Sequence, residues 1–303
     1  MAPSHVTNPS TESASDPPGV LRVAMAQIAP VLGDLQRNLT LHLEQIEAAR
    51  RQHADLIVFP ELSLTGYFIR DMVPDLAISP DGPEIRQLID AAGPMALVVG
   101  LVEESPRHRF YNSAIWAEGG RVAHLHRKVY LPTYGLFDEQ RYFAAGDRFF
   151  AFDTARFGRV GILICEDFWH LSAVAILQAE EIDLLVCTSN SPARGVDGPV
   201  VRTAETYEQL SKTFAQLLGA AVLVVNRVGF EDGLCFWGGS MAVGPDGRAV
   251  AQAPMLDESL TTAVFDPAEW RRQRLIMPLA RDERLLVTLE EFLRIKRKKY
   301  DRP

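Results

Sequence analysis

Short, continuous runs of apolar residues recur along the chain, and they limit its fold more than any other feature. Examples are "LIVFP" at 56–60, "GILIC" at 161–165 and "LLVC" at 184–187. Runs of this length without polar alternation are typical of strands that are covered on both faces. Because such strands need helices or a second sheet over each face, the pattern favours an α/β architecture.

Amphipathic segments alternate with these strands. We expect strands at 21–30, 55–61, 94–104, 159–165, 182–190 and 221–229, and helices at 33–55, 82–93, 172–181, 201–220 and 281–302. Two hairpins are inserted, at 110–132 with a Gly119-Gly120 turn and at 238–253 with an Asp246-Gly247 turn. The order predicts mixed sheets flanked by helices in a single domain, residues 19–303. Residues 1–18, rich in Ser, Pro and Thr, are expected to be a disordered tail.

Charge and cysteine content argue against several classes of function. A net charge of −8 argues against general nucleic-acid binding. No apolar run approaches the roughly 18 residues that would span a bilayer, and the N-terminus lacks the apolar centre of a signal peptide. The cysteines, Cys165, Cys187 and Cys235, show no CxxC spacing, and the histidines show no metal spacing. These features predict a cytoplasmic protein in a reducing compartment, without a metal site or a membrane contact.

Three reactive side chains fall where apolar runs end: Glu61, Lys128 and Cys165. The carboxyl ends of strands are where active-site groups gather in α/β sheets. A glutamate could accept the thiol proton, and a lysine ammonium could stabilise an oxyanion. Each residue taken alone has a simpler explanation, as a core cysteine, a capping carboxylate or a surface lysine. Spacing alone does not decide between these explanations.

Longer motifs around the three residues decide between them. The stretches "VFPELSLTGY" at 58–67, "HRKVYLPTYGLFDEQRYFAAG" at 126–146 and "GILICEDFWH" at 161–170 resemble, in order and spacing, the three signatures of the nitrilase (carbon–nitrogen hydrolase) superfamily. The later "VVNRVGFEDGLCFWGGSMAVGPDGR" resembles the segment that follows them, so the resemblance covers about residues 20 to 295.

The resemblance implies a four-layer αββα sandwich and a Glu-Lys-Cys triad. By position, it makes Glu61 the general base, Lys128 the oxyanion stabiliser and Cys165 the nucleophile, with the Glu166 amide completing the oxyanion site and Glu139 supporting the lysine. No metal or organic cofactor is implied, and Cys187 and Cys235 are expected to be structural. The family also implies a homo-oligomer, a dimer or larger. Phe168 and Trp169 are then expected near such an interface, at the pocket wall or in the core.

Within the superfamily, "LPTYGLFDEQRYF" followed by "CEDFW" is most similar to the glutaminase domain of glutamine-dependent NAD synthetases. In that branch, residues matching Tyr134, Phe137 and Ser191 line the pocket for the glutamine head group. The "SNSPARG" stretch departs from the usual Asn-Ala-Ser-Pro pattern, so Ser191 is the weakest of these assignments. We find no Ser-Gly-Gly-type pyrophosphate loop of an ATP-using domain, and we expect that this chain does not make NAD by itself.

Three functions follow as hypotheses. The first is an amidase, glutaminase-like or ω-amidase-like, acting on a small carboxamide. The second is an N-carbamoyl amidohydrolase or a nitrilase, and the third is a glutaminase subunit that works only with a partner synthetase. Arg194 and Arg202 are either ligands for a substrate carboxylate or ordinary surface residues. Asp167 either orients the loop after Cys165 or is a surface carboxylate.

Overall fold

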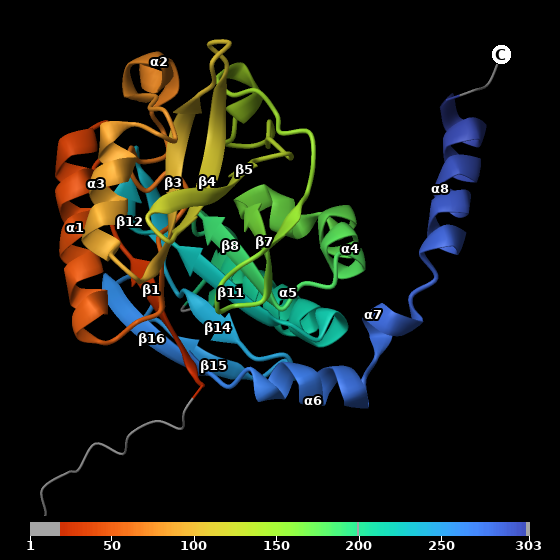
Figure 1. Cartoon of the computed structure of the whole chain (residues 1–303). Helices are drawn as coiled ribbons and strands as arrows, with labels where there is room; N and C mark the ends of the chain where they lie inside the picture. Colours follow the sequence, from red (N-terminus) through yellow and green to blue (C-terminus); the bar gives the residue numbers. More distant parts are fainter. Residues whose placement is uncertain (1–18, 199, 301–303) are drawn as a thin grey trace, which may run out of the picture.

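Two sheets packed face to face form the centre of the structure, a computed structural model that describes residues 19–198 and 200–300 (Figure 1). Within these residues each main sheet is six-stranded, with order β16-β1-β2-β3-β4-β5 in the first sheet and β15-β14-β11-β8-β7-β6 in the second. The disordered tail predicted at 1–18 lies outside the described residues.

The first sheet comprises β1 (Leu21–Gln27), β2 (Leu56–Val58), β3 (Ala96–Glu104), β4 (Phe110–Glu118), β5 (Arg121–Arg127) and β16 (Ser259–Phe265). The second comprises β6 (Ala151–Asp153), β7 (Arg159–Ile164), β8 (Leu184–Ser189), β11 (Ala221–Asn226), β14 (Met241–Val243) and β15 (Ala249–Gln252). The central pairs β1-β2-β3 and β7-β8-β11 are parallel, and the outer pairs are antiparallel. The carboxyl ends of β2 and β7 therefore define, in each sheet, the edge at which ligand-binding and active-site residues gather in α/β folds.

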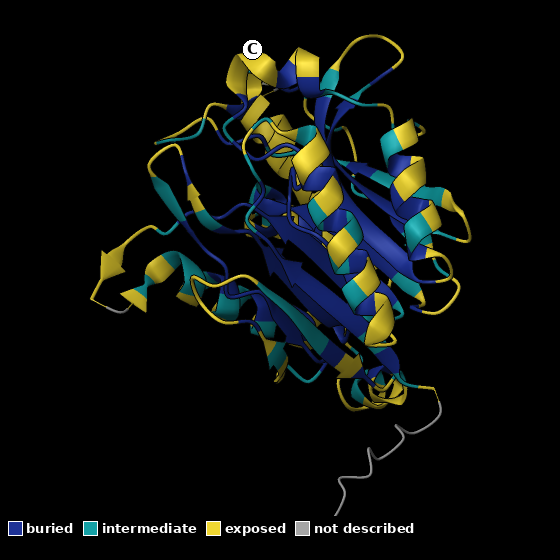
Figure 2. Ribbon diagram, turned by 90° about the vertical axis from the view of Figure 1, so that its left-hand side faces the viewer, coloured by how far each residue is buried: buried dark blue, intermediate teal, exposed yellow. Residues whose placement is uncertain are grey.

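Helices cover the outer face of each sheet. The main ones are α1 (Leu35–Arg51), α3 (Pro83–Ala92), α4 (Leu171–Ala179) and α5 (Arg202–Leu218). Side chains of α1 and α3 share one apolar cluster with the first sheet, and those of α4 and α5 share another with the second. A third apolar cluster contains buried side chains of both sheets and lies between them. In Figure 2 the strands of the sheets are mostly dark blue, the colour of buried residues. The layers are α, β, β and α, which confirms the predicted sandwich.

Several elements were not expected from the sequence. Strand β16 pairs with β1 along its whole length, and β12 (Val228–Glu231) with β13 (Leu234–Trp237) forms a separate hairpin beyond β11. The remaining short elements are α2 (Val73–Leu76), β9 (Val196–Asp197), β10 (Val200–Val201), α6 (Ala268–Ile276), α7 (Leu279–Asp282) and three single helical turns, Arg70–Met72, Glu139–Arg141 and Cys165–Trp169. They lie in segments without a strong periodic pattern.

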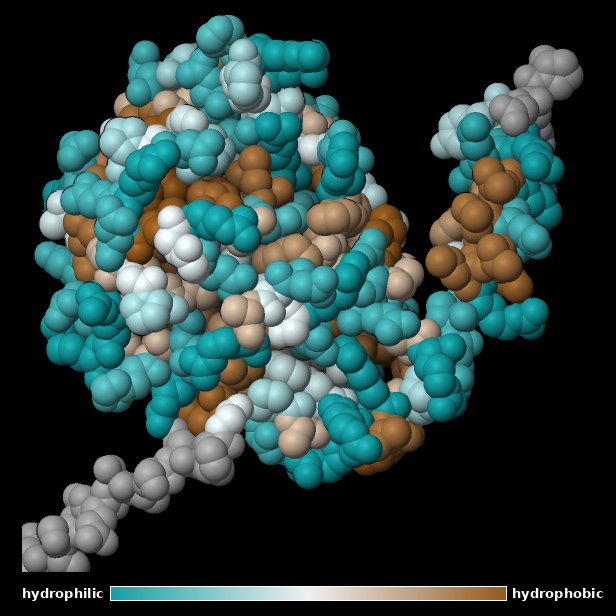
Figure 3. All heavy atoms as spheres, in the orientation of Figure 1, coloured by the Kyte–Doolittle hydropathy of each residue, from teal (hydrophilic) through white to brown (hydrophobic). Residues whose placement is uncertain are grey.

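The last helix, α8 (Leu285–Tyr300), stands apart from both sheets (Figure 1). None of its described residues is buried, and its exposed leucines form an apolar patch beside a basic end (Figure 3). The predicted helix at 281–302 therefore forms, with a later start. Among the described helices, none is long and apolar enough to cross a bilayer.

One glycine of β3 decides how closely the loop after β2 approaches the first sheet. A Cβ at Gly100 would lie 2.5 Å from both the Pro60 carbonyl oxygen and the Leu62 nitrogen. Both atoms belong to the backbone that flanks Glu61. Backbone atoms, unlike the end of a flexible side chain, cannot shift easily to relieve the clash. Gly100 is thus required for the position of Glu61.

We expect Gly100→Ala to lower the free energy of unfolding by about 2 kcal/mol, because overpacking forces backbone shifts. Urea denaturation followed by circular dichroism measures the change. Gly244→Ala is the matched control, since its Cβ would meet the movable Asp246 carboxylate at 3.1 Å. Equal stabilities for the two variants would contradict this account of Gly100.

Candidate active site

The strand ends bring Glu61, Lys128 and Cys165 to one place between the two sheets. Glu61 follows β2 and Lys128 follows β5, both in the first sheet, whereas Cys165 follows β7 in the second. The Lys128 Nζ donates a hydrogen bond to Glu61 Oε1 at 2.7 Å, and both side chains are fully buried. Each sheet therefore contributes part of the group, which assembles only when the sheets pack together.

Two asparagines hold the Glu61 carboxylate in place. Asn112 Nδ2 donates to Oε1 at 2.7 Å, and the Asn190 backbone N–H donates to Oε2 at 2.8 Å. The Asn190 side chain also donates to the Glu61 carbonyl oxygen at 2.7 Å. With the lysine, both carboxylate oxygens of Glu61 have hydrogen-bond donors. Neither asparagine lies near Glu61 in the chain, so no local motif points to them.

Lys128 contacts a second carboxylate, that of Glu139, at 2.6 Å. The Tyr67 hydroxyl donates to the same Glu139 oxygen at 2.5 Å. Burial lowers the pKa of Lys128, but the Glu139 and Glu61 carboxylates outweigh it and raise that pKa well above its ordinary value. Burial raises the pKa of Glu139 to about 7, against the opposing effect of the Lys128 charge. One fixed cation thus lies between two carboxylates.

Cys165 begins the helical turn Cys165–Trp169 with a φ of 46°, in the left-handed region that non-glycine residues rarely adopt. Strained backbone of this kind is concentrated at functional sites. The Ser189 hydroxyl lies 3.4 Å and the Tyr207 hydroxyl 3.5 Å from its Sγ. Burial, followed by the Glu61 charge, raises the pKa of the thiol to about 12.

Asp167 connects the segments that contain Lys128 and Cys165. Its carboxylate accepts the Val129 N–H at 3.1 Å and the Ile164 N–H at 3.2 Å, and it pairs with His126 Nε2 at 2.9 Å. Asp167 is fully buried, so its alternative assignment as a surface carboxylate is wrong. Its side chain fixes the residue after the lysine relative to the residue before the cysteine.

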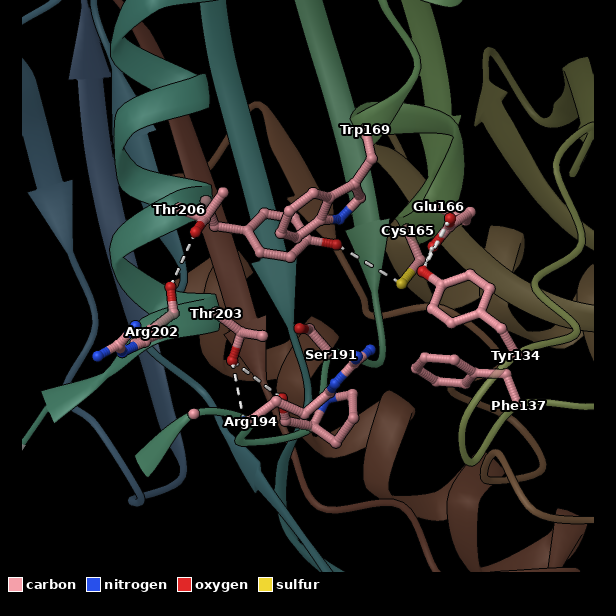
Figure 4. Close-up of a pocket in the computed structure, with 13 residues that line it drawn as sticks. Tyr134, Phe137, Cys165, Glu166, Trp169, Ser191, Arg194, Arg202, Thr203 and Thr206 are labelled. Carbon is pink, nitrogen blue, oxygen red and sulfur yellow. Dashed lines mark hydrogen bonds between the residues drawn. The ribbon is translucent and has the colours of Figure 1, made fainter. Parts of the chain in front are cut away.

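A cavity of about 330 Å³ opens onto Cys165 (Figure 4). Its wall includes the three residues expected to bind substrate, Tyr134, Phe137 and Ser191, as well as Glu166, Trp169, Arg194 and Arg202. The Tyr134 hydroxyl donates to the Glu166 carboxylate at 3.0 Å.

The aromatic and basic residues that follow these motifs separate into core and pocket. Trp169 lies at the pocket wall, whereas Phe168 is fully buried in the core. The Arg194 guanidinium lies 5.8 Å from the Tyr134 ring centroid and 5.7 Å from that of Phe137. Arg194 is therefore part of the pocket rather than an isolated surface residue.

The other cysteines lie elsewhere. Cys187 lies on β8 and is buried in the apolar core, and Cys235 lies on β13 and is half-buried. Within residues 19–198 and 200–300, no group of three or more His, Cys, Asp or Glu side chains is arranged to hold a metal ion.

Comparison with known proteins identifies the family of this chain. The sequence model described as carbon-nitrogen hydrolase matches residues 22–275. The chain belongs to the carbon-nitrogen hydrolase family. Its structure is similar to a carbon-nitrogen hydrolase from Helicobacter pylori G27, with a TM-score of 0.80, 24% identity and coverage of 88% of this chain and 96% of that one. That likeness confirms the fold.

This carbon-nitrogen hydrolase also resembles larger proteins. It is 33% identical over 257 residues to a glutamine-dependent NAD(+) synthetase of Acinetobacter baylyi, covering 85% of this chain and 46% of that protein. The structure of the glutamine-dependent NAD+ synthetase from Acinetobacter baumannii with ADP aligns with a TM-score of 0.73 and 32% identity, over 83% of this chain and 46% of that one. The chain thus spans about half the length of the curated relatives it matches.

The raised pKa of Glu139 predicts a pH dependence of stability for this carbon-nitrogen hydrolase. Between the ordinary value of 4.5 and about 7, the folded state binds a proton that the unfolded state has released. Stability from this group is therefore fully present below pH 4.5 and falls as pH rises through 7, by about 3 kcal/mol. We expect Glu139→Gln to lack this slope, so the difference in free energy of unfolding between parent and variant should itself fall as pH rises from 4.5 to about 7.

Urea denaturation at pH 5, 6, 7 and 8 measures the slope. Glu44→Gln on the exposed side of α1 is the matched control and is expected to leave it unchanged. A parental slope retained in Glu139→Gln would show that another group is responsible.

Proposed function

We propose that the protein is a cysteine-dependent amidase that hydrolyses a small carboxamide through a thioester and releases ammonia. The observation that most supports this is the buried Glu61–Lys128 ion pair, whose charges both act on the Cys165 thiol, together with the cavity that the thiol lines. A thiol with a pKa of about 12 remains protonated at neutral pH, so it needs a base to become a nucleophile. We assign that role to Glu61, whose charge acts on the thiol and raises its pKa.

In the first half-reaction Glu61 accepts the Cys165 proton, and the sulfur attacks the amide carbonyl carbon. The carbonyl oxygen takes the electron pair, and Lys128 Nζ with the Glu166 N–H stabilises it. Glu61 then gives its proton to the amide nitrogen as the C–N bond breaks, so ammonia leaves and a thioester remains. Glu139 keeps the lysine in place, since it holds Nζ at 2.6 Å.

In the second half-reaction Glu61 removes a proton from water, and the resulting hydroxide attacks the thioester carbonyl. The C–S bond breaks, the acid product leaves, and the sulfur recovers the proton from Glu61. In this sequence the Glu61 carboxylate serves as base, then as acid, then as base again. The three hydrogen-bond donors to it hold its position through these steps.

The pocket favours a carboxamide that also has a carboxylate, such as glutamine or another ω-amide. Arg194 offers a cation at the wall, held against the Tyr134 and Phe137 rings. Glu166 offers an anion on the same wall, which suits an α-ammonium group. The glutamine-dependent relatives support glutamine as the first substrate to test.

A second candidate is a glutaminase subunit that delivers ammonia to a partner synthetase. Its support is the 33% identity to a glutamine-dependent NAD(+) synthetase of Acinetobacter baylyi. Glutaminase activity that appears or rises at least ten-fold on adding a purified ammonia-dependent NAD synthetase would favour this candidate over a free-standing amidase.

Ammonia release from glutamine, ω-amides of keto acids, N-carbamoyl amino acids and nitriles tests the proposal. We expect turnover of carboxamides, reduced at least 10⁴-fold, that is by about 5 kcal/mol, in Cys165→Ala and Glu61→Gln. Cys235→Ala is the matched control and is expected to retain activity. Turnover restricted to carbamoyl compounds or nitriles would move the assignment to those hydrolases, and turnover that survives in Cys165→Ala would exclude the mechanism.

Arg194→Met tests how the substrate is recognised. We expect KM for glutamine to rise at least ten-fold, while turnover of acetamide, which has no carboxylate, is unchanged, because one charge-assisted contact is lost. Arg248→Met, on the exposed β14–β15 hairpin, is the control. An equal loss for both substrates would mean that Arg194 maintains pocket shape rather than binding a carboxylate.

A further inference from the structure

Two hydroxyl groups from different elements converge on the Cys165 sulfur. Strands β7 and β8 are parallel, and Ile164 pairs with Thr188, so Ser189 is the residue beside Cys165 at the next step. Its hydroxyl lies 3.4 Å from Sγ. Tyr207 reaches the sulfur from α5, with its hydroxyl at 3.5 Å. Both side chains are almost completely buried, so water does not compete freely for these donors.

The three atoms form a triangle, because the two hydroxyl oxygens are also 3.1 Å apart. Two O–H protons are available for three contacts, so the arrangement depends on the charge of the sulfur. When the sulfur is a thiolate, both protons point to it. When it is neutral, as a thiol or a thioester, one hydroxyl donates to the other. The triangle can therefore follow the charge on the sulfur by rotation of two O–H bonds.

The surroundings of the sulfur otherwise disfavour a negative charge. The thiol is buried and close to the Glu61 carboxylate, and both raise its pKa, whereas the Ser189 and Tyr207 hydroxyls lower it. Lys128 also lowers it, but this ammonium is already paired with two carboxylates. Tyr207 remains a donor at neutral pH, because burial, with the nearby cysteines, raises its own pKa well above the ordinary value.

We propose that Ser189 and Tyr207 are catalytic residues that donate hydrogen bonds to the Cys165 thiolate, both when it forms and when it leaves the thioester. This inference rests on the proposed function for its place in the reaction. The thiolate exists twice in each cycle: after Glu61 takes the thiol proton, and again when the C–S bond breaks. Hydrogen bonds to it stabilise both states, since donors to a charged acceptor are the strong ones.

Packing explains the Tyr207 ring but not its hydroxyl. The ring stacks on Phe168 at 5.8 Å and meets Trp169 edge-on at 5.3 Å. A phenylalanine would make the same ring contacts, so packing alone does not need the oxygen. Tyr207→Phe removes only the donor and keeps the shape of the cavity wall. Ser189→Ala does the same for the second donor.

The test measures the thiol itself, without a substrate. Tyr207→Phe, Ser189→Ala and the double variant are treated with iodoacetamide at pH 8, and alkylation of Cys165 is followed by peptide mass spectrometry. Losing one hydrogen bond to a charged sulfur lowers the thiolate fraction about ten-fold. Each unit of higher pKa makes the remaining thiolate about three-fold more nucleophilic. We therefore expect alkylation about three-fold slower in each single variant and about ten-fold slower in the double variant.

Kinetics with the carboxamide found in the substrate panel provide a second readout. We expect kcat to fall about ten-fold in each single variant with little change in KM, because the hydroxyls act on the sulfur and not on substrate binding. Tyr130→Phe is the matched control: it also removes a phenol hydroxyl bonded to a serine, Ser172 at 2.7 Å, at an exposed site. Alkylation of Cys235, on β13, in the same samples is the internal control.

Folded variants in which Cys165 is alkylated at the parental rate would overturn the proposal, even if turnover fell, since the hydroxyls would then act on something other than the sulfur. If Tyr207→Phe does not fold, Ser189→Ala provides the test by itself. A parent that turns over no amide, but whose Cys165 alkylation slows in both variants, would refute the amidase proposal and leave the role of the hydroxyls supported.

Discussion

The buried ammonium of Lys128, between the carboxylates of Glu61 and Glu139, is the interaction on which the rest of the site depends. Removing one member of a buried ion pair costs about 3–5 kcal/mol, because the remaining charge is left without a partner. Each carboxylate also accepts hydrogen bonds from partners other than the lysine. These are Asn112 and Asn190 at Glu61, and Tyr67 at Glu139. These contacts fix the positions of the carboxylates and the ammonium relative to one another.

The site is divided between the two sheets. Glu61 and Lys128 come from the first sheet, and Cys165, Ser189 and the turn that contains Asp167 come from the second. Asp167 connects the two halves by accepting hydrogen bonds from Val129 and Ile164. The geometry around the sulfur thus depends on how the sheets pack, and changes in the core between them are expected to alter activity as well as stability.

Much of this arrangement could be predicted from the sequence. The buried strands and the reactive residues at their ends follow from local patterns, because a continuous apolar run and the residue after it are adjacent in the chain. The motifs around Glu61, Lys128 and Cys165 indicated the family. By contrast, Asn112 and Tyr207 became visible only in three dimensions, since their contacts join residues 51 and 42 positions apart. Strand β16 could not be predicted from local patterns, because its partner β1 lies far from it in the sequence and no local signal connects the two strands.

The most direct test of the account is to stop the reaction with acid during turnover and locate the acyl group by peptide mass spectrometry. The account predicts an adduct on Cys165 alone, with the mass of the carboxamide minus ammonia, that disappears when the substrate is consumed. An adduct on another residue, or steady turnover with Cys165 free of any adduct at every time point, would contradict it.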